Sequence, residues 1–212
     1  MPNLPISQLP VASSLTGAEL FPTVQGGVTK YTTLNSMTFI QGNNYGLFNQ
    51  TGSSTPISNT TTETSVLDGG VGTLSVPANG FTKGDAFHAV LTGHVSSVNN
   101  HTLRIRIKSN GATLADTGTI SMPQTTEQHW KLDIHFTINQ IGAATTASIS
   151  TGGTFLYTKD ASNAFEGASF STENSSSFDT TTPNTLSITA QWGTANSGDS
   201  IYSNICTLNK TY

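Results

Sequence analysis

The sequence is short of charge, since only 9% of its 212 residues are Asp, Glu, Lys or Arg, against about 25% in an ordinary globular protein. The formal net charge is −4, so the chain lacks the basic footprint of a protein that binds nucleic acid or an anionic membrane. Serine, threonine, asparagine and glycine are abundant instead. Disorder usually accompanies high net charge and few β-branched residues. We therefore expect a folded, β-rich protein with no nucleic-acid partner.

Cysteine and long apolar runs are also scarce. Cys206 is the one cysteine, so no intrachain disulfide forms; its apolar surroundings predict a small buried residue, with a reactive or interchain thiol as the alternative. No stretch approaches the roughly 18 apolar residues of a membrane span. The first residues carry neither the basic nor the apolar segment of a secretion signal. We expect neither membrane insertion nor export by a leader.

Motifs of catalysis and metal binding are missing from the sequence. It contains no H-E-x-x-H, C-x-x-C, G-x-S-x-G or calcium-loop pattern, and its aspartates stand mostly in turn-like contexts, where they support local backbone hydrogen bonds. We expect no enzyme, no cofactor and no metal centre. One alternative uses His88 and His94, which share a strand face but lie about 20 Å apart. Three copies of one of them around a trimer axis could hold an ion; solvated histidines are the competing interpretation.

What the sequence has in quantity is period-two alternation of apolar and polar residues, from about residue 47 onward. It is clearest over 103–108, 130–138 and 186–192, and weaker over 72–76, 86–95, 113–120, 147–157 and 201–208. Clusters of turn residues separate these segments. About eight to ten strands with almost no helical periodicity predict an all-β fold, an antiparallel β-sandwich and most economically a jelly roll.

Residues 1–40 form a segment too small to hold a core, yet with regular apolar positions. Segments 19–24 and 28–33 flank Gly26-Gly27, which predicts a hairpin, and residues 35–40 could form one helical turn. We expect an arm over 1–40 that docks onto another protein, followed by a sandwich domain over 41–212. The expected apolar contacts of the arm are Leu9, Leu15, Leu20, Phe21, Val24 and Val28.

The arm carries the motifs I-S-Q-L-P (6–10), L-T-G-x-E-L-F-P (15–22) and V-Q-x-G-V-T-x-x-T-T-L (24–34). They resemble the N-terminal segment of many tailed-phage virion proteins, which include tail fibres, tail spikes and head decoration proteins. In the body, G-T-L-S-V-P-A-N (72–79), L-R-I-R-I-K (103–108) and N-T-L-S-I-T-A-Q-W (184–192) are similar to a jelly-roll domain at the C-terminal end of many phage virion proteins. The resemblance implies an arm that attaches to other virion proteins (capsid or tail), a homotrimer, and a virion assembled in the host cytoplasm.

Within the virion class, two uses compete. One is a capsid decoration or head-fibre protein, and the other is a tail fibre or receptor-binding protein for host attachment. The absence of heptads and repeats argues against a long shaft and favours decoration. A candidate of another class is a soluble carbohydrate-binding module with Trp130 and Trp192 as sugar platforms. Both tryptophans fall on the apolar side of their strands, which favours core packing.

Two surfaces remain as candidate contact sites. The segment 157–179 has the weakest periodicity and is expected to be a long loop; its aromatic residues Tyr157, Phe165, Phe170 and Phe178 either recognise a partner such as a host surface glycan or anchor the loop to the sandwich. Arg104, Arg106 and Lys108 form a basic stripe on one strand face. The stripe protects a wet face against aggregation, contacts an acidic patch of a neighbouring subunit, or binds nucleic acid.

Overall fold

A computed structural model describes residues 20–33, 45–160 and 164–212. The chain divides into two units, Met1–Gly42 and Asn43–Tyr212. Every regular element of the described residues is a β-strand, and none of these residues belongs to a helix that could cross a membrane. The docking role assigned to residues 1–40 stays a prediction, and the helical turn expected at 35–40 lies outside the described residues.

The first unit contains the hairpin expected at Gly26-Gly27. Strands β1 (Leu20–Gln25) and β2 (Val28–Thr33) pair antiparallel. Both turn glycines have positive φ, +61° and +77°. A two-residue turn of this hand matches the twist of the strands that it joins, and glycine adopts it without strain. The predicted hairpin is therefore confirmed.

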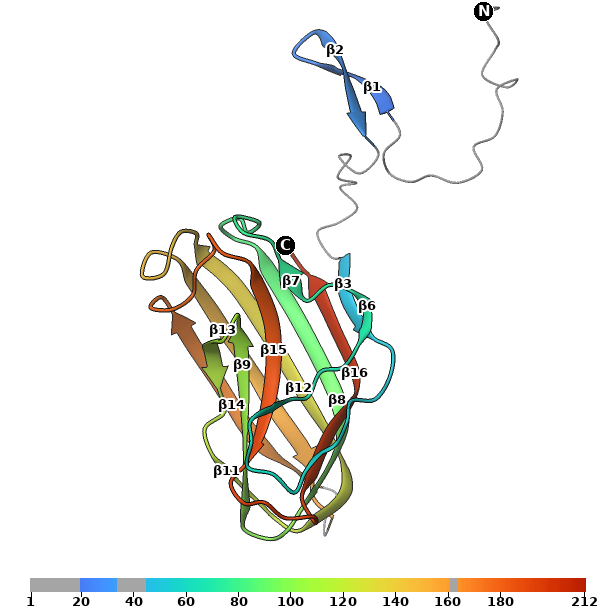
Figure 1. Ribbon diagram of the computed structural model, residues 1–212, viewed down its shortest axis with the longest axis vertical. Coiled ribbons are helices and arrows are strands. Elements are labelled where there is room, and N and C mark those ends of the chain that lie inside the picture. Colours follow the sequence, from blue (N-terminus) through green and yellow to red (C-terminus); the bar gives the residue numbers. More distant parts are fainter. Residues whose placement is uncertain (1–19, 34–44, 161–163) are drawn as a thin grey trace, which may run out of the picture. The chain divides into compact units, whose positions relative to one another are not determined.

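The second unit is a sandwich of two antiparallel sheets (Figure 1). The smaller sheet follows the order β10-β9-β15-β5, with β11 on β9 and β7 on β15; the larger follows β14-β13-β12-β8-β16-β3-β6, with β4 on β16. The strands of the smaller sheet are β5 (Thr64–Ser65), β7 (Ser75–Val76), β9 (His101–Ser109), β10 (Ala112–Asp116), β11 (Ile120–Met122) and β15 (Asn184–Trp192). The strands of the larger are β3 (Tyr45–Gln50), β4 (Ile57–Ser58), β6 (Gly70–Gly72), β8 (Ala86–Ser97), β12 (Thr125–Gln140), β13 (Ser148–Thr158), β14 (Phe165–Asn174) and β16 (Ser200–Lys210). The predicted antiparallel β-sandwich is confirmed.

At two places in the chain, consecutive strands change sheet. β8 and β9 lie in opposite sheets, and so do β15 and β16, while β8 pairs with β16 and β9 with β15. This wrapped pairing is the arrangement on which a jelly roll is built. The strands β12, β13 and β14 add a plain meander to the larger sheet.

The core lies between the sheets and follows the alternation seen in the sequence. Leu91, Leu132 and Ile134 of the larger sheet and Ile105 and Ile188 of the smaller are among its buried residues. Burying each such side chain contributes roughly 1.5–3 kcal/mol. The polar residues between them point outward, so each sheet has one solvent-exposed face.

Both tryptophans and the cysteine belong to this core, as the sequence predicts. The indole N–H of Trp192 donates to the carbonyl of Ile57 at 3.0 Å, and that of Trp130 donates to the carbonyl of His94 at 3.0 Å. Buried indoles with satisfied N–H groups act in packing, which favours the interpretation of both tryptophans as core residues. Cys206 is fully buried, and burial raises the pKa of its thiol to about 12.

The expectation of a long loop over 157–179 is wrong. β13 continues to Thr158, and β14 occupies much of the segment, pairing from Thr158 with Phe165 to Ile149 with Asn174. β14 is the edge strand of the larger sheet, and most of its residues are exposed. An edge strand exposed on both faces has little need of apolar alternation, which is why the periodicity signal was weak there.

Candidate functional site

Of the four aromatic residues proposed for recognition, three pack against the sandwich. Tyr157 and Phe178 are each 1% exposed, and Phe170 packs against the core. The hydroxyl of Tyr157 donates to Glu166 at 3.0 Å, and burial together with that carboxylate raises the tyrosine pKa. The burial of Tyr157 and Phe178, and the packing of the half-buried Phe170 against the core, favour anchoring over recognition for these three. Phe165 differs, because 76% of it is exposed.

The outer face of the larger sheet gathers four of the five histidines of the sequence. They come from β8 and β12, which are adjacent and antiparallel. The register places His88 opposite His135 and His94 opposite His129. Directly opposed residues of neighbouring strands bring their Cβ atoms to about 5 Å, so the four histidines form two cross-strand pairs. The second pair is part of a groove, and the first is joined by a carboxylate.

The second pair belongs to an aromatic row across three strands. The ring centroid of His94 lies 4.5 Å from that of His129 and 5.4 Å from that of Tyr202 on β16. Nδ1 of His94 lies 2.8 Å from Oδ1 of Asn204, and the hydroxyl of Tyr202 donates to Glu127 at 3.1 Å. These contacts orient the rings of His94 and Tyr202 within the row.

Beside this row lies an open groove, here called the aromatic groove. Its lining includes His94, His129, Lys131, Leu156, Phe165 and Asn204. Leu156 and Phe165 are exposed apolar residues, and the imidazoles, the lysine and the amide supply hydrogen-bonding groups. An apolar surface with a few convergent polar groups is the usual composition of a site for small ligands.

The first pair forms a second group, here called the His88 cluster: His88, Lys131, Asp133 and His135. Oδ1 of Asp133 lies 2.8 Å from Nε2 of His88 and 3.4 Å from Nε2 of His135, and Oδ2 lies 2.8 Å from Nζ of Lys131. Burial alone would raise the pKa of Asp133, but hydrogen bonds from Lys131 and His88 and their charges outweigh it, so the pKa lies below its ordinary value. The aspartate is thus a carboxylate with one oxygen facing both imidazoles.

Sequence reasoning missed the His88 cluster. It grouped His88 with His94 on one strand, whereas the structure pairs each with a histidine of β12. The missing information was the register, because His88 and Asp133 are 45 residues apart. The period-two spacing of Asp133 and His135 on one strand face was the signal available.

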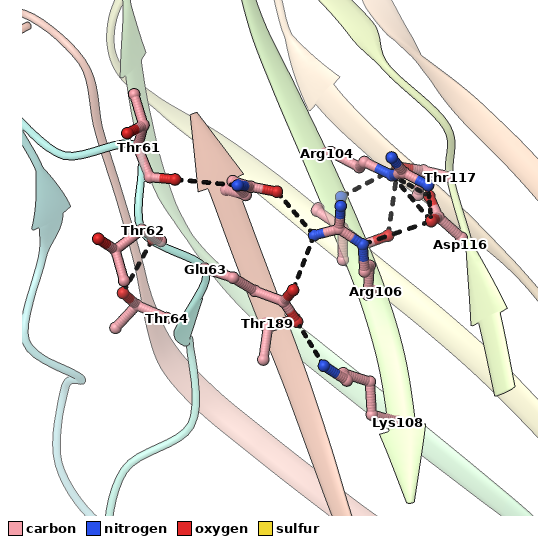
Figure 2. A network of polar contacts seen from close by, with 12 residues as sticks. Thr61, Thr62, Glu63, Thr64, Arg104, Arg106, Lys108, Asp116, Thr117 and Thr189 are labelled. Carbon is pink, nitrogen blue, oxygen red and sulfur yellow. Dashed lines mark hydrogen bonds and ion pairs between the residues drawn. The ribbon is translucent and has the colours of Figure 1, made fainter. Parts of the chain in front are cut away.

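The basic stripe lies on the outer face of the smaller sheet and is neutralised within its own chain (Figure 2). Glu63, from the segment that precedes β5, accepts from Arg106 and Lys108 at 3.0 Å each and from the hydroxyl of Thr189 at 2.7 Å. Burial alone would raise the pKa of Glu63, but the bonds from Thr189 and Lys108 and the charge of Arg106 lower it below its ordinary value. Glu63 therefore ties its segment across β9 and β15.

Asp116 on β10 neutralises the other end of the stripe. It accepts from Nε and Nη2 of Arg104 and lies 3.5 Å from Nε of Arg106. The hydrogen bond to Asp116 raises the pKa of Arg104. Burial alone would raise the pKa of Asp116, but the hydrogen bonds from Arg104 and from the backbone of Gly118 outweigh burial and lower that pKa. All three basic side chains are thus paired internally. This pattern favours the interpretation of a solvent-exposed face protected by charge.

A cavity of about 210 Å³ lies between the two sheets. Its lining is mainly apolar and includes Leu47, Leu74, Phe81, Phe136, Phe178 and Leu186. Asp85, the one carboxylate in the lining, lies 2.6 Å from Nζ of Lys210. The composition of this lining suits an apolar group.

The hairpin of the first unit carries the described part of the predicted docking residues. Leu20, Val24 and Val28 are 65%, 74% and 58% exposed. Phe21 lies in β1, and Leu9 and Leu15 lie outside the described residues. Three large apolar side chains thus face solvent on a two-stranded hairpin.

Comparison with known proteins leaves the family open. No protein-family model and no curated protein matches the sequence. Among solved structures, the chain aligns with the CBM2 module of the evolved Dit protein of Lactobacillus casei BL23 phage J-1, at 11% identity and a TM-score of 0.23. The alignment covers 64% of this chain and 65% of that one, less than two thirds of its length.

Proposed function

We propose that this protein is a structural virion component, a capsid decoration or head-fibre protein that its N-terminal segment attaches to the particle. The observation that carries the proposal is the exposed apolar surface of the hairpin, Leu20, Val24 and Val28. A two-stranded hairpin is marginally stable at best in water. It gains stability when another protein covers its apolar side chains, at about 25 cal/mol per Å² of apolar surface buried. A capsid or tail protein is the partner that the sequence motifs imply.

The sandwich supplies the displayed part. It has its own core of apolar residues from both sheets, so it does not need the hairpin for a hydrophobic interior.

We expect three copies to associate, because the motifs resemble those of trimeric virion proteins. Light scattering should then give three times the chain mass of 22.2 kDa, and a mass equal to one chain would contradict the trimer.

The attachment test separates the two units. A chain without residues 1–42 should stay folded and should no longer co-sediment with particles, whereas the full chain should. A matched variant, Val24→Asp with Val28→Asp, keeps the length of the arm and should also lose attachment. Unchanged co-sedimentation of both variants would contradict the proposal.

Gold-labelled antibody on intact particles distinguishes the two uses within the virion: label over the head means decoration, and label at the tail tip means a receptor-binding protein.

A second candidate function is recognition of a host surface glycan in the aromatic groove. The specific observation is Phe165, an exposed aromatic ring beside the imidazoles of His94 and His129. Aromatic faces flanked by hydrogen-bonding groups suit the apolar faces and hydroxyls of sugars. Phe165→Ala should abolish binding on a glycan array without lowering the melting temperature. A chain that binds glycans but joins no particle would instead favour a soluble carbohydrate-binding module.

A further inference from the structure

The outer face of β8 and β12 places three metal-ligating side chains within reach of one point. The ligand atoms of His88, Asp133 and His135 all lie within 4.8 Å of one another. The imidazole rings of His88 and His135 are stacked, with centroids 4.3 Å apart and 5° between their planes. We propose that His88, Asp133 and His135 form a binding site for a divalent transition-metal ion such as Zn²⁺ or Ni²⁺.

The separations fit an ion placed between the three groups. Two ligands bound to zinc at about 2.1 Å stand about 3.4 Å apart when the site is tetrahedral, and about 3.0 Å apart when it is octahedral. Oδ1 of Asp133 lies 3.4 Å from Nε2 of His135 and 2.8 Å from Nε2 of His88. The distances from the carboxylate oxygen to the two imidazole nitrogens therefore match the ligand–ligand distances of a coordinated ion to within a few tenths of an ångström.

The sheet gathers the ligands in advance, and ion binding then requires a rotation of the stacked imidazoles about their side-chain torsions, because the Nε2 lone pairs of two parallel rings do not meet at one point. His88 and His135 are opposed in the register, and Asp133 precedes His135 by two residues on the same strand face. Lys131 occupies the other carboxylate oxygen, Oδ2, at 2.8 Å and so turns Oδ1 toward the imidazoles. A second contact that orients a ligating carboxylate is a common feature of metal sites. Ion binding replaces the hydrogen bond between Nε2 of His88 and Oδ1 of Asp133, because each neutral imidazole must then carry its proton on Nδ1 and leave the Nε2 lone pair for the ion.

The donor set selects the ion. Imidazole nitrogen suits zinc, nickel and copper, whereas calcium and magnesium prefer oxygen ligands. Two nitrogens and one oxygen therefore favour the former group. Three protein ligands leave at least one coordination position for water or an external group.

The same two strands provide a matched control. His94 and His129 are also a cross-strand pair of β8 and β12, with ring centroids 4.5 Å apart. The side chain within hydrogen-bonding distance of the His94 ring nitrogen is the amide of Asn204, at 2.8 Å, and not a carboxylate. A neutral amide contributes far less to binding a divalent cation than a carboxylate does, so this pair should bind the ion much more weakly.

The test is calorimetric titration of the tag-free full chain with ZnCl₂ and with NiCl₂ at about pH 7.5, where free imidazole is mostly neutral. We expect one ion per chain. His88→Gln, His135→Gln and Asp133→Asn should each weaken binding at least tenfold, and His94→Gln and His129→Gln should change it by less than twofold. Zinc should also raise the melting temperature of the wild type and of His94→Gln, but not of His88→Gln.

Three results would overturn the proposal. The first is no binding by the wild type, and the second is equal loss in the control variants. The third is one ion per three chains, which would place the ion between subunits. Melting temperatures measured in EDTA separate loss of a ligand from loss of folding, since these side chains are at least partly exposed and the variants should melt like the wild type there.

Discussion

Nδ1 of His101 lies 2.7 Å from Oδ2 of Asp199, a carboxylate whose side chain is fully buried. The other oxygen of Asp199 accepts the backbone N–H of Val98 at 2.9 Å. These contacts join the turn before β16 to the connection between β8 and β9. Because a carboxylate withdrawn from water depends on its partners, this turn is one of the places where the two sheets are held together.

Replacing Asp199 by alanine should therefore be costly. The change leaves the N–H of Val98 and the ring of His101 without their acceptor, and we expect the free energy of unfolding to fall by about 3 kcal/mol. Urea denaturation followed by tryptophan fluorescence measures it. Asp160, which is exposed, is the matched control, and its alanine variant should lose less than about 0.5 kcal/mol. Equal effects of the two substitutions would contradict the role given to Asp199.

The stability of the smaller sheet should depend on acid pH through Glu63. Its folded pKa is lowered, so its contribution is present above the unfolded pKa of about 4.3 and is lost as the pH falls through the folded value. Glu63→Gln should reduce the free energy of unfolding by about 1–2 kcal/mol at neutral pH, and the gap to the wild type should shrink toward about pH 3. Denaturation curves across this range measure the gap. Glu173→Gln, at an exposed position of β14, should show no comparable gap at neutral pH.

Gly93 should not tolerate a side chain. It lies in β8 beside the bulge of β16, and an added Cβ would collide with the carbonyl oxygen of Tyr202. Since that atom belongs to the backbone of a central strand, it cannot move aside cheaply, and Gly93→Ala should cost at least about 2 kcal/mol. Gly52→Ala, where a Cβ would meet nothing within 4 Å, is the control. Thermal unfolding of the two variants compares them, and a neutral Gly93→Ala would mean that the strands separate more easily than their packing implies.

The thiol of Cys206 should be inert in the folded protein. Burial raises its pKa to about 12, and the thiolate is the reactive form. A chromogenic disulfide reagent at about pH 8 should detect no thiol in the native chain and one per chain in concentrated guanidinium chloride. Rapid labelling without denaturant would show that β16 opens or that the thiol is exposed in the assembled protein.

The sandwich was predictable because strands such as β8 and β9 alternate between buried and more exposed residues. Leu103, Ile105 and Ile107 point inward and Arg104 and Arg106 point outward, in the register that the sequence implies. The alternation fails at β14, where an edge strand exposed on both faces has no need of it, and Phe165 was therefore grouped with the buried Phe178. Very short strands such as β5 are missed because two residues are too few to show an alternation of apolar and polar side chains.

The sequence by itself determined the fold class, the hairpin at Gly26-Gly27, the buried tryptophans and the buried cysteine. Each follows from local rules: period-two burial, positive φ at glycine, and apolar surroundings. The tertiary structure alone decided which polar residues meet. His88 joins Asp133 across two strands, and Glu63 joins Lys108 across the smaller sheet. Such contacts depend on strand order and register, which are fixed by packing between residues far apart in the chain and leave no periodic trace in the sequence.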